Sequence, residues 1–149
     1  MRLVENRHVV GRNQPAADRQ IEKEERVIDE ITGWMRVNGE AVYGSRPWRV
    51  FGEGPTKPPT GVMAEGEAKP FVAEDVRFTA KSGVLHAFFM LPPVGEARIP
   101  SLAGVPVEQV TFQDGRPLAF RREADALVVT MPRTTSLVPR ISLRGRGLV

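Results

Sequence analysis

The spacing of apolar residues divides the chain into a helical part and a part with strand periodicity. From Asp18 to Asn38, apolar side chains recur at intervals of three, four and seven residues, which places them on one stripe of an α-helix. The stripe consists of Ile21, Val27, Ile28, Ile31, Trp34 and Met35. Asn38-Gly39 is expected to end the helix, because glycine readily takes the left-handed conformation that follows a C-cap. Such a helix needs a packing partner.

Beyond residue 70 the apolar period changes to two, which is typical of β-strands. Asp75–Ala80 alternates polar and apolar residues, and Val84–Leu91 is hydrophobic enough to predict a central strand. Further strands are predicted at Ala97–Leu102, Val107–Phe112, Leu118–Arg122, Ala126–Met131 and Val138–Leu143. Short strands without helices between them favour an antiparallel sandwich or barrel. The predicted class is therefore mainly β, an antiparallel β-sandwich preceded by one amphipathic helix.

Composition narrows the possible functions. The 149 residues suit one domain, or one small domain with an appendage, and the absence of cysteine excludes disulfides and thiol nucleophiles. No segment is apolar for long enough to cross a bilayer, and the charges scattered through MRLVENRHVV predict no signal peptide. We therefore expect no membrane partner, while the compartment stays unknown.

The basic balance of the chain, +3 with a pI of about 9.8, raises the question of nucleic acid. Basic residues are spread along the chain and interleaved with acidic ones, whereas a nucleic-acid footprint needs basic residues gathered on one face. The densest group, Arg140, Arg144 and Arg146, shares strand parity and is interpreted as the solvated face of an edge strand. No nucleic-acid partner is predicted.

Groups able to carry chemistry are few. His8 lies in a segment without periodicity, and His86 lies in the hydrophobic strand, where a packed, hydrogen-bonded histidine is the more common case. No histidine and carboxylate have the spacing of metal ligands, and no cofactor motif is present, so neither metal nor cofactor is predicted. The carboxylates outside the helix are interpreted as caps, turn residues or solvated charges, and they are Glu40, Glu53, Glu65, Glu67, Glu74 and Asp75.

A resemblance to a known family lies in Ile31–Trp48, which reads ITGWMRVNGEAVYGSRPW. This run resembles the end of the catalytic domain in α-L-fucosidases of glycoside hydrolase family 29, where a helix ending in Trp leads into Asn-Gly-Glu-Ala and then Tyr-Gly-(Thr/Ser)-Arg-Pro-Trp. Phe51–Thr56 and Asp75–Thr79 are similar to the family as well. The resemblance extends from about Ile21 to the end of the chain.

The resemblance implies an enzyme of two parts, a (β/α)8-like barrel that hydrolyses α-L-fucosyl linkages with retention and a β-sandwich behind it. The catalytic carboxylates of the family lie in barrel strands upstream of the motif, so no catalytic and no substrate-binding residue is assigned here. The chain is expected to be a C-terminal fragment, inactive alone, that supports the barrel. The barrel is then its partner, and a fucosylated glycan is a partner only through that barrel.

On this interpretation the motif joins the last barrel helix to the sandwich. The residues expected at that interdomain seam are Trp34, Asn38, Gly39, Glu40, Tyr43, Arg46 and Trp48, with Tyr43 and Trp48 burying their rings. The implied segments are a last barrel helix with its crossover at residues 20–51, a linker at 52–70 and the sandwich at 71–149. Residues 1–19 do not match the family and are expected to be disordered or to come from an out-of-frame reading.

Two alternatives stay open. A stand-alone sandwich would bind carbohydrate, although both Trp residues and the Tyr lie in the helix and the seam rather than on the predicted strands. An interaction domain would use the apolar helix stripe for self-association, because that stripe needs a partner.

Overall fold

The computed structural model describes residues 14–57 and 68–149. His8, Glu65, Glu67 and most of the non-matching segment 1–19 lie outside the described residues. The chain separates into two compact units, Met1–Arg36 and Val37–Val149. The first unit contributes most of a long helix, and the second contains the end of that helix together with all the strands described below.

Helix α1 (Gln14–Val42) begins before Asp18 and continues through Asn38-Gly39, where the sequence predicted its end. That prediction was wrong. A glycine inside a helix costs about 1 kcal/mol relative to alanine, but Asn38 and Gly39 are both buried, so tertiary packing outweighs this cost. The helix ends before Gly44, whose φ of 66° takes the left-handed conformation that had been expected at Gly39.

The apolar stripe of α1 is exposed over much of its length. Ile21, Val27, Ile28 and Ile31 keep between 52% and 61% of their surface accessible. Trp34 and Met35, farther along the same stripe, are half-buried. The helix therefore presents large apolar side chains to solvent, as a surface that packs on a partner would.

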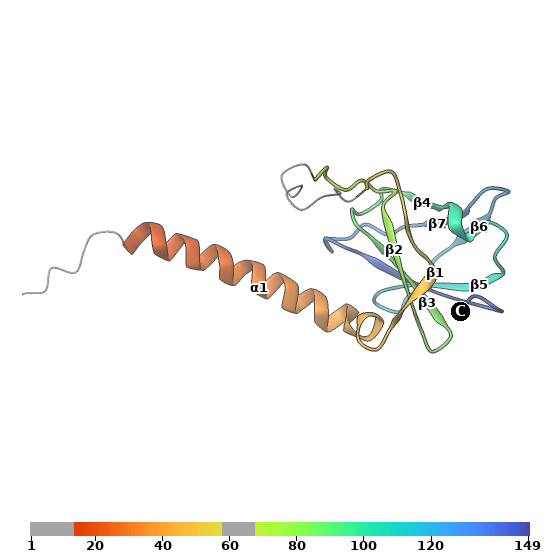
Figure 1. Ribbon diagram of the computed structural model, residues 1–149, viewed down its shortest axis with the longest axis horizontal. Helices are drawn as coiled ribbons and strands as arrows, with labels where there is room; N and C mark the ends of the chain where they lie inside the picture. The colour runs from red at the N-terminus through yellow and green to blue at the C-terminus, as the bar shows by residue number, and fades with distance from the viewer. Residues whose placement is uncertain (1–13, 58–67) are drawn as a thin grey trace, which may run out of the picture. The chain divides into compact units, whose positions relative to one another are not determined.

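Two antiparallel sheets form the sandwich (Figure 1). The larger sheet contains, in spatial order, β1 (Arg46–Glu53), β2 (Val76–Lys81), β3 (Val84–Phe89), β8 (Arg140–Gly145) and β5 (Val107–Phe112). The smaller sheet contains β4 (Glu96–Ile99), β7 (Leu127–Thr130) and β6 (Phe120–Arg122), and a short 3-10 helix, η2 (Pro100–Leu102), follows β4. The predicted mainly-β class, an antiparallel sandwich preceded by a helix, is confirmed.

Individual strands follow the sequence pattern to different degrees. Val107–Phe112 has the predicted bounds, and the hydrophobic strand is β3, which is central and buried at every position. The other predicted strands are shorter or shifted by a few residues. β1 was not predicted as a strand, because Arg46-Pro47-Trp48 has no clear alternation.

The alternation of β2 and β3 gives the larger sheet two different faces. Phe78, Leu85 and Phe89 point inward and join the apolar core between the sheets. Val84, His86 and Phe88 of β3 lie on the opposite, outer face and are also buried. The outer face of β3 is therefore covered, and the end of α1 is part of what covers it.

A two-residue hairpin connects β2 and β3. Lys81 and Val84 pair directly, and the intervening Ser82 and Gly83 have φ values of 50° and 77°. Two successive positive φ angles match the primed turns whose twist suits antiparallel strands. This turn brings Lys81 and Ser82 to the end of the sheet near the end of the helix.

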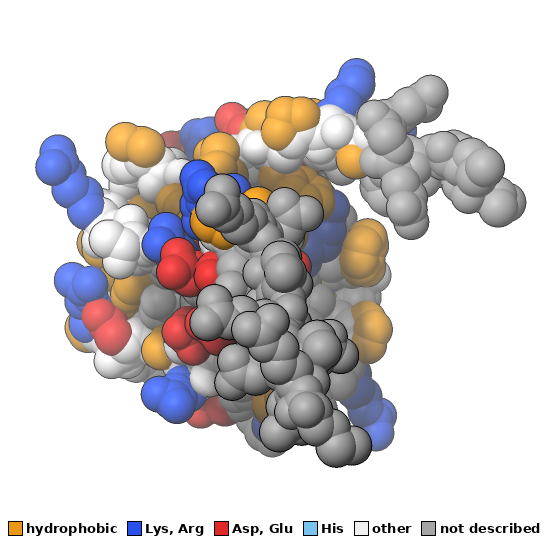
Figure 2. All heavy atoms as spheres, turned by 90° about the vertical axis from the view of Figure 1, so that its left-hand side faces the viewer, with side chains coloured by type: hydrophobic (Ala, Val, Ile, Leu, Met, Phe, Trp, Pro, Cys, Tyr) orange, Lys and Arg blue, Asp and Glu red, His pale blue; other side chains and the backbone are white. Residues whose placement is uncertain are grey.

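Within the described residues, no helix is long and apolar enough to cross a membrane. On the face shown in Figure 2, Lys and Arg side chains are interspersed with acidic and hydrophobic ones rather than gathered into one patch.

Candidate functional site

A row of polar side chains crosses the outer face of the larger sheet. Thr79 of β2 pairs with His86 of β3, His86 pairs with Ser142 of β8, and Ser142 pairs with Thr111 of β5. Residues paired across strands lie on the same face of a sheet, so these four side chains share the outer face. Arg140 of β8 lies two residues from Ser142 and therefore points to the same side.

The last turns of α1 are fixed to this face through their backbone carbonyls. Thr79 Oγ1 donates a hydrogen bond to the carbonyl oxygen of Ala41 at 2.9 Å. Lys81 Nζ donates to the carbonyls of Glu40 and Tyr43 at 2.9 and 2.7 Å. The last carbonyls of a helix have no partner inside the helix, and here the sheet supplies donors for them.

Arg140 lies at the centre of the contact between the helix end and the sheet. Its Nε donates to Asn38 Oδ1 at 3.0 Å, and its Nη2 lies 3.3 Å from Glu40 Oε1. Its Nη1 donates to His86 Nδ1 at 3.2 Å and to Ser142 Oγ at 3.1 Å. The residue is only 2% exposed, so this is a buried guanidinium whose charge is shared among several acceptors.

These contacts assign the protonation of His86. A guanidinium has no acceptor, so Nδ1 of His86 must accept from Arg140, and the proton of the neutral ring lies on Nε2. Burial, and then the charge of Arg140, lower the pKa of His86 to about 4. His86 is therefore neutral at pH 7, and a proton on Nδ1 would oppose the arginine beside it.

Burial also lowers the pKa of Arg140 from its usual value, against the raising effect of Glu40. Arginine remains charged at any physiological pH even so. We call the group formed by Asn38, Glu40, His86, Arg140 and Ser142 the polar joint. Its polar atoms are engaged with one another, which suits a structural connection better than catalysis.

The seam residues predicted from the sequence differ in how they are packed. Asn38, Gly39 and Trp48 are buried, whereas Glu40, Arg46 and Tyr43 are exposed, Tyr43 to 69%. Trp34 is half-buried. The structure brings Asn38 and Glu40 together on Arg140. The expected burial of the Tyr43 ring does not occur within this chain, and a role of these residues at an interdomain seam stays a prediction.

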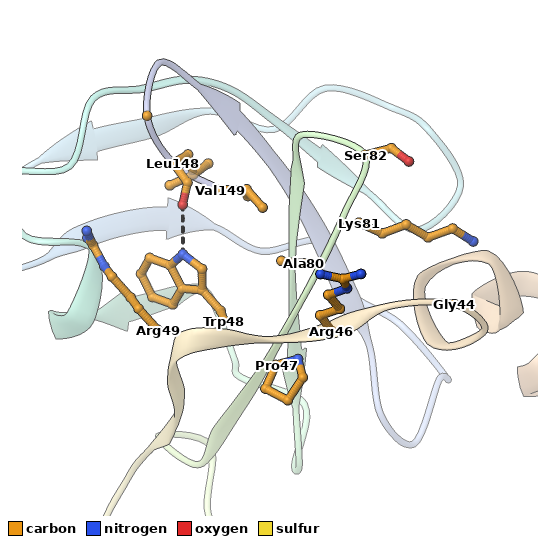
Figure 3. A pocket seen from close by; sticks show the side chains of 11 residues that line it. Gly44, Arg46, Pro47, Trp48, Arg49, Ala80, Lys81, Ser82, Leu148 and Val149 are labelled. Atoms are coloured by element: carbon orange, nitrogen blue, oxygen red, sulfur yellow. Dashed lines mark hydrogen bonds between the residues drawn. The ribbon is translucent and has the colours of Figure 1, made fainter.

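Trp48 connects β1 to the end of the chain. Its Nε1 donates to the carbonyl of Leu148 at 2.7 Å, and its ring lies 5.2 Å from that of Phe78 at an angle of 60°. The guanidinium of Arg49 lies over the Trp48 ring, 4.7 Å from its centre. Beside this tryptophan is a pocket of about 530 Å³ lined by β1, the β2–β3 turn and residues 147–149 (Figure 3).

Two of the carboxylates considered as catalysts, Asp75 and Glu53, have structural contacts. Asp75 is buried and accepts hydrogen bonds from the backbone N–H groups of Thr56 and Val72 at 3.0 and 2.8 Å. Burial acts to raise the pKa of Asp75, but these hydrogen bonds and the charge of Arg77 outweigh it, so the pKa lies below its usual value. Glu53 accepts from the backbone N–H of Ser101 at 2.8 Å. Among the described residues, no group of three or more His, Asp or Glu side chains is placed to hold a metal ion.

Sequence reasoning missed the central residue of the polar joint. Arg140 was interpreted as part of a solvated edge strand, but β8 lies between β3 and β5 and the side chain is buried. A usable signal was present in the strand pattern. His86 interrupts the most hydrophobic strand, and a polar residue there indicates a buried polar partner on the neighbouring strand.

This chain is similar to known proteins in its structure, whereas comparisons of its sequence found no match. No family model matches the chain, and no curated protein matches it in sequence. The α-fucosidase of Thermotoga maritima in complex with a mechanism-based inhibitor aligns with 74% of this chain and 24% of its own, at 22% identity and a TM-score of 0.55. α-L-Fucosidase isoenzyme 1 from Paenibacillus thiaminolyticus aligns with 81% of this chain and 26% of its own, at 21% identity and a TM-score of 0.56.

The chain thus spans about a quarter of the length of the fucosidases that it matches. At this identity the likeness establishes a shared fold. The resemblance predicted from the sequence is confirmed at that level, because the structure aligns with one part of α-L-fucosidases, consistent with a C-terminal part.

Proposed function

We propose that this chain is the C-terminal part of an α-L-fucosidase and that its role is to support a catalytic barrel. The observation that carries the proposal is the alignment of most of the chain with about a quarter of each matched fucosidase. The remaining three quarters of those enzymes have no counterpart here. Retaining hydrolysis of terminal α-L-fucosyl linkages would then belong to the missing part.

The exposed residues of the helix and the seam support this role. The stripe of Ile21, Ile28 and Ile31 is apolar and accessible, and Tyr43 follows it at the end of the helix. Large apolar side chains gathered on one surface are typical of an interface. A barrel packed on the helix would cover the stripe, while the polar joint keeps the end of the helix attached to the sandwich.

An activity measurement tests where catalysis lies. The purified chain should not hydrolyse an aryl α-L-fucoside, because its described carboxylates are exposed or committed to structural contacts. The matched control is the same preparation with Glu40→Gln, which changes the seam carboxylate. Turnover by the unaltered chain that scales with its concentration would refute the assignment of catalysis to a missing part, and its loss in Glu40→Gln would identify Glu40 as the group responsible.

A second experiment tests the origin of the chain. We would sequence about 1.2 kilobases of genomic DNA upstream of the first codon and translate every frame, since a (β/α)8 barrel typically needs about 250 residues. A barrel with its carboxylates in any frame supports the proposal. The absence of a barrel from all frames would instead make this a stand-alone sandwich.

Self-association is a second candidate, favoured by the same exposed stripe. Ile21, Ile28 and Met35 are spaced by seven residues, which is the repeat of helices that pack in pairs. Sedimentation should then show a dimer that Ile28→Glu converts to a monomer, whereas Val94→Glu, at a 97% exposed turn of the sandwich, should not change the mass. A monomer at all concentrations would eliminate this candidate.

A further inference from the structure

The pocket beside Trp48 carries more positive than negative charge. Of its eleven lining residues, Arg46, Arg49 and Lys81 have cationic side chains, and the α-carboxylate of Val149 is the one acidic group among them. Within the part of the chain that the structure describes, none of these three cations forms an ion pair. A hollow bordered by three cations and one carboxylate keeps a net positive charge, which favours an anion.

Two of the three cations are held in place by neutral groups. Lys81 Nζ is bonded to the carbonyl oxygens of Glu40 and Tyr43, which orient the ammonium without neutralising it. Arg49 lies over the ring of Trp48, and that ring is in turn fixed by its hydrogen bond to Leu148. In Figure 3, Arg46 and Lys81 lie on one side of the Trp48 ring and Arg49 lies on the other.

We propose that this pocket binds a phosphate or sulfate ester carried on a polar body of monosaccharide size. A phosphate monoester has about −1.5 to −2 charges at pH 7, so we expect it to bind more tightly than a sulfate ester, which is singly charged. The guanidinium of Arg46, exposed and without an ion-pair partner among the described residues, can donate two parallel hydrogen bonds to such a group.

The size and lining of the pocket suit the rest of such a ligand. Its volume of about 530 Å³ exceeds that of a bare ion and lies among those of small-molecule sites. The Ser82 hydroxyl lies at the rim and the Trp48 ring lies within, so polar and apolar contacts are both available. The proposal does not rest on the supporting role proposed above, because every residue of the pocket belongs to this chain.

Nuclear magnetic resonance of the intact chain tests the proposal at low ionic strength, where charge interactions are least screened. The probes are glucose 6-phosphate and glucose 6-sulfate, with glucose and acetate as the comparisons. The chain has two tryptophans, so a Trp34→Phe variant identifies the indole N–H signal of Trp48. We expect saturable shifts of that signal and of the Ser82 amide with both esters, in the millimolar range, and none with glucose.

Substitutions of the cationic residues show which of them bind the ester group. Arg46→Gln should weaken binding of the esters by about tenfold, as expected when one charge-assisted hydrogen-bonding group is removed. Arg49→Gln, a second variant, should weaken it as well. Arg133→Gln removes an exposed arginine that does not line the pocket, and it should leave the affinity unchanged.

Three results would overturn the proposal. The first is the absence of a saturable shift with either ester in the unaltered chain. The second is an equal loss of affinity in Arg133→Gln, which would indicate general attraction to a basic protein. The third is acetate binding as tightly as the esters, which would indicate a site for a carboxylate side chain. None of these results depends on finding a barrel, so the failure of this proposal and that of the supporting role are distinguishable.

Discussion

The central strand of the larger sheet, β3, is buried on both faces, yet the two faces are built from different residues. The inner face contributes Phe78, Leu85 and Phe89 to an apolar core. The outer face contributes His86, Arg140 and Ser142 to the polar joint. Apolar contact stabilises in proportion to area and has little direction, whereas a guanidinium with several acceptors fixes distances and angles.

The difference indicates a division of tasks between the faces. The inner face supplies the free energy that holds the two sheets together. The outer face determines where the helix end lies, because Arg140 is satisfied only when Asn38 and Glu40 are in place. A buried ionic group seldom adds much net stability, but it is costly to leave half-satisfied.

The largest effect is expected on the inner face. Phe89→Ala removes a fully buried ring from the core and should lower the free energy of unfolding by about 3–5 kcal/mol. Urea denaturation followed by circular dichroism measures the change. Val94→Ala is the control, because Val94 is 97% exposed and its loss should have little effect. A cost for Phe89→Ala below about 1 kcal/mol would contradict the assignment of this residue to the core.

The outer face should respond almost as strongly when its central residue is removed. Arg140→Met removes the 3.0 Å hydrogen bond to Asn38 Oδ1 and one of the two donors to His86 Nδ1, since Ser142 Oγ also lies 2.9 Å from that nitrogen. The substitution should cost about 3 kcal/mol. The control is Arg144→Met, which removes an exposed arginine from the same strand. Adding Asn38→Leu to Arg140→Met should recover part of the loss, since the amide oxygen that lost its arginine donor is then gone. A stable Arg140→Met protein would show that the polar joint does not hold the helix end.

A smaller effect is expected from pH. The pKa of His86 is about 4 in the folded protein and near 6.5 when the chain is unfolded. Between these values the unfolded state binds the extra proton, so stability falls as the pH decreases from 6.5 toward 4 and is fully present above 6.5. The charged groups around the ring are Arg140, Lys81 and Arg144, which oppose protonation, and Glu40, which favours it.

His86→Asn isolates this contribution. Asparagine can still accept a hydrogen bond from Arg140 but does not titrate, so the variant should lose less stability than the unaltered chain over the same pH range. Thermal unfolding at several pH values measures the difference, and carboxylates that titrate in both proteins cancel. Parallel pH profiles would show that His86 is free to take up a proton in the folded state.

The smallest effect is expected at the rim of the polar joint. The side chain of Glu40 is 75% exposed, so water screens its 3.3 Å contact with Arg140. Glu40→Gln should change stability by no more than about 0.5 kcal/mol, with less effect at high salt. Denaturation at two salt concentrations tests this. A cost comparable to that of Arg140→Met would mean that Glu40 is the main counter-charge of the arginine.

The local pattern of apolar and polar residues was sufficient to predict the class of the fold. The change of apolar period after the helix predicted a mainly-β sandwich, and the hydrophobicity of Val84–Leu91 predicted a central strand. Both follow from the sequence because a strand or helix face must be apolar along its own length before it can be buried. The motif around Asn38 to Trp48 similarly indicated the fucosidase fold, which the structural likeness confirms.

Most of the polar joint could not be predicted from the sequence. His86 was expected to be a packed, hydrogen-bonded residue, and it is. Its partner Arg140 was assigned to the wrong environment, because the spatial order β3-β8-β5 places a strand from the end of the chain at the centre of the sheet. Strand order depends on pairings between distant segments, and no local pattern records it.

The sequence by itself determined that one amphipathic helix precedes a series of β-strands, and which strand lies deepest. Only the tertiary structure decided that the helix continues through Asn38-Gly39 and that Arg140 is buried. Asn38 and Arg140 are separated by 102 positions and are joined by a hydrogen bond. Because of this contact, each residue adopts a state that its local sequence does not favour. Asn38 remains helical, and Arg140 gives up its hydration. The helical conformation of Asn38 and the burial of Arg140 become favourable only when the sheet brings the guanidinium to the amide oxygen.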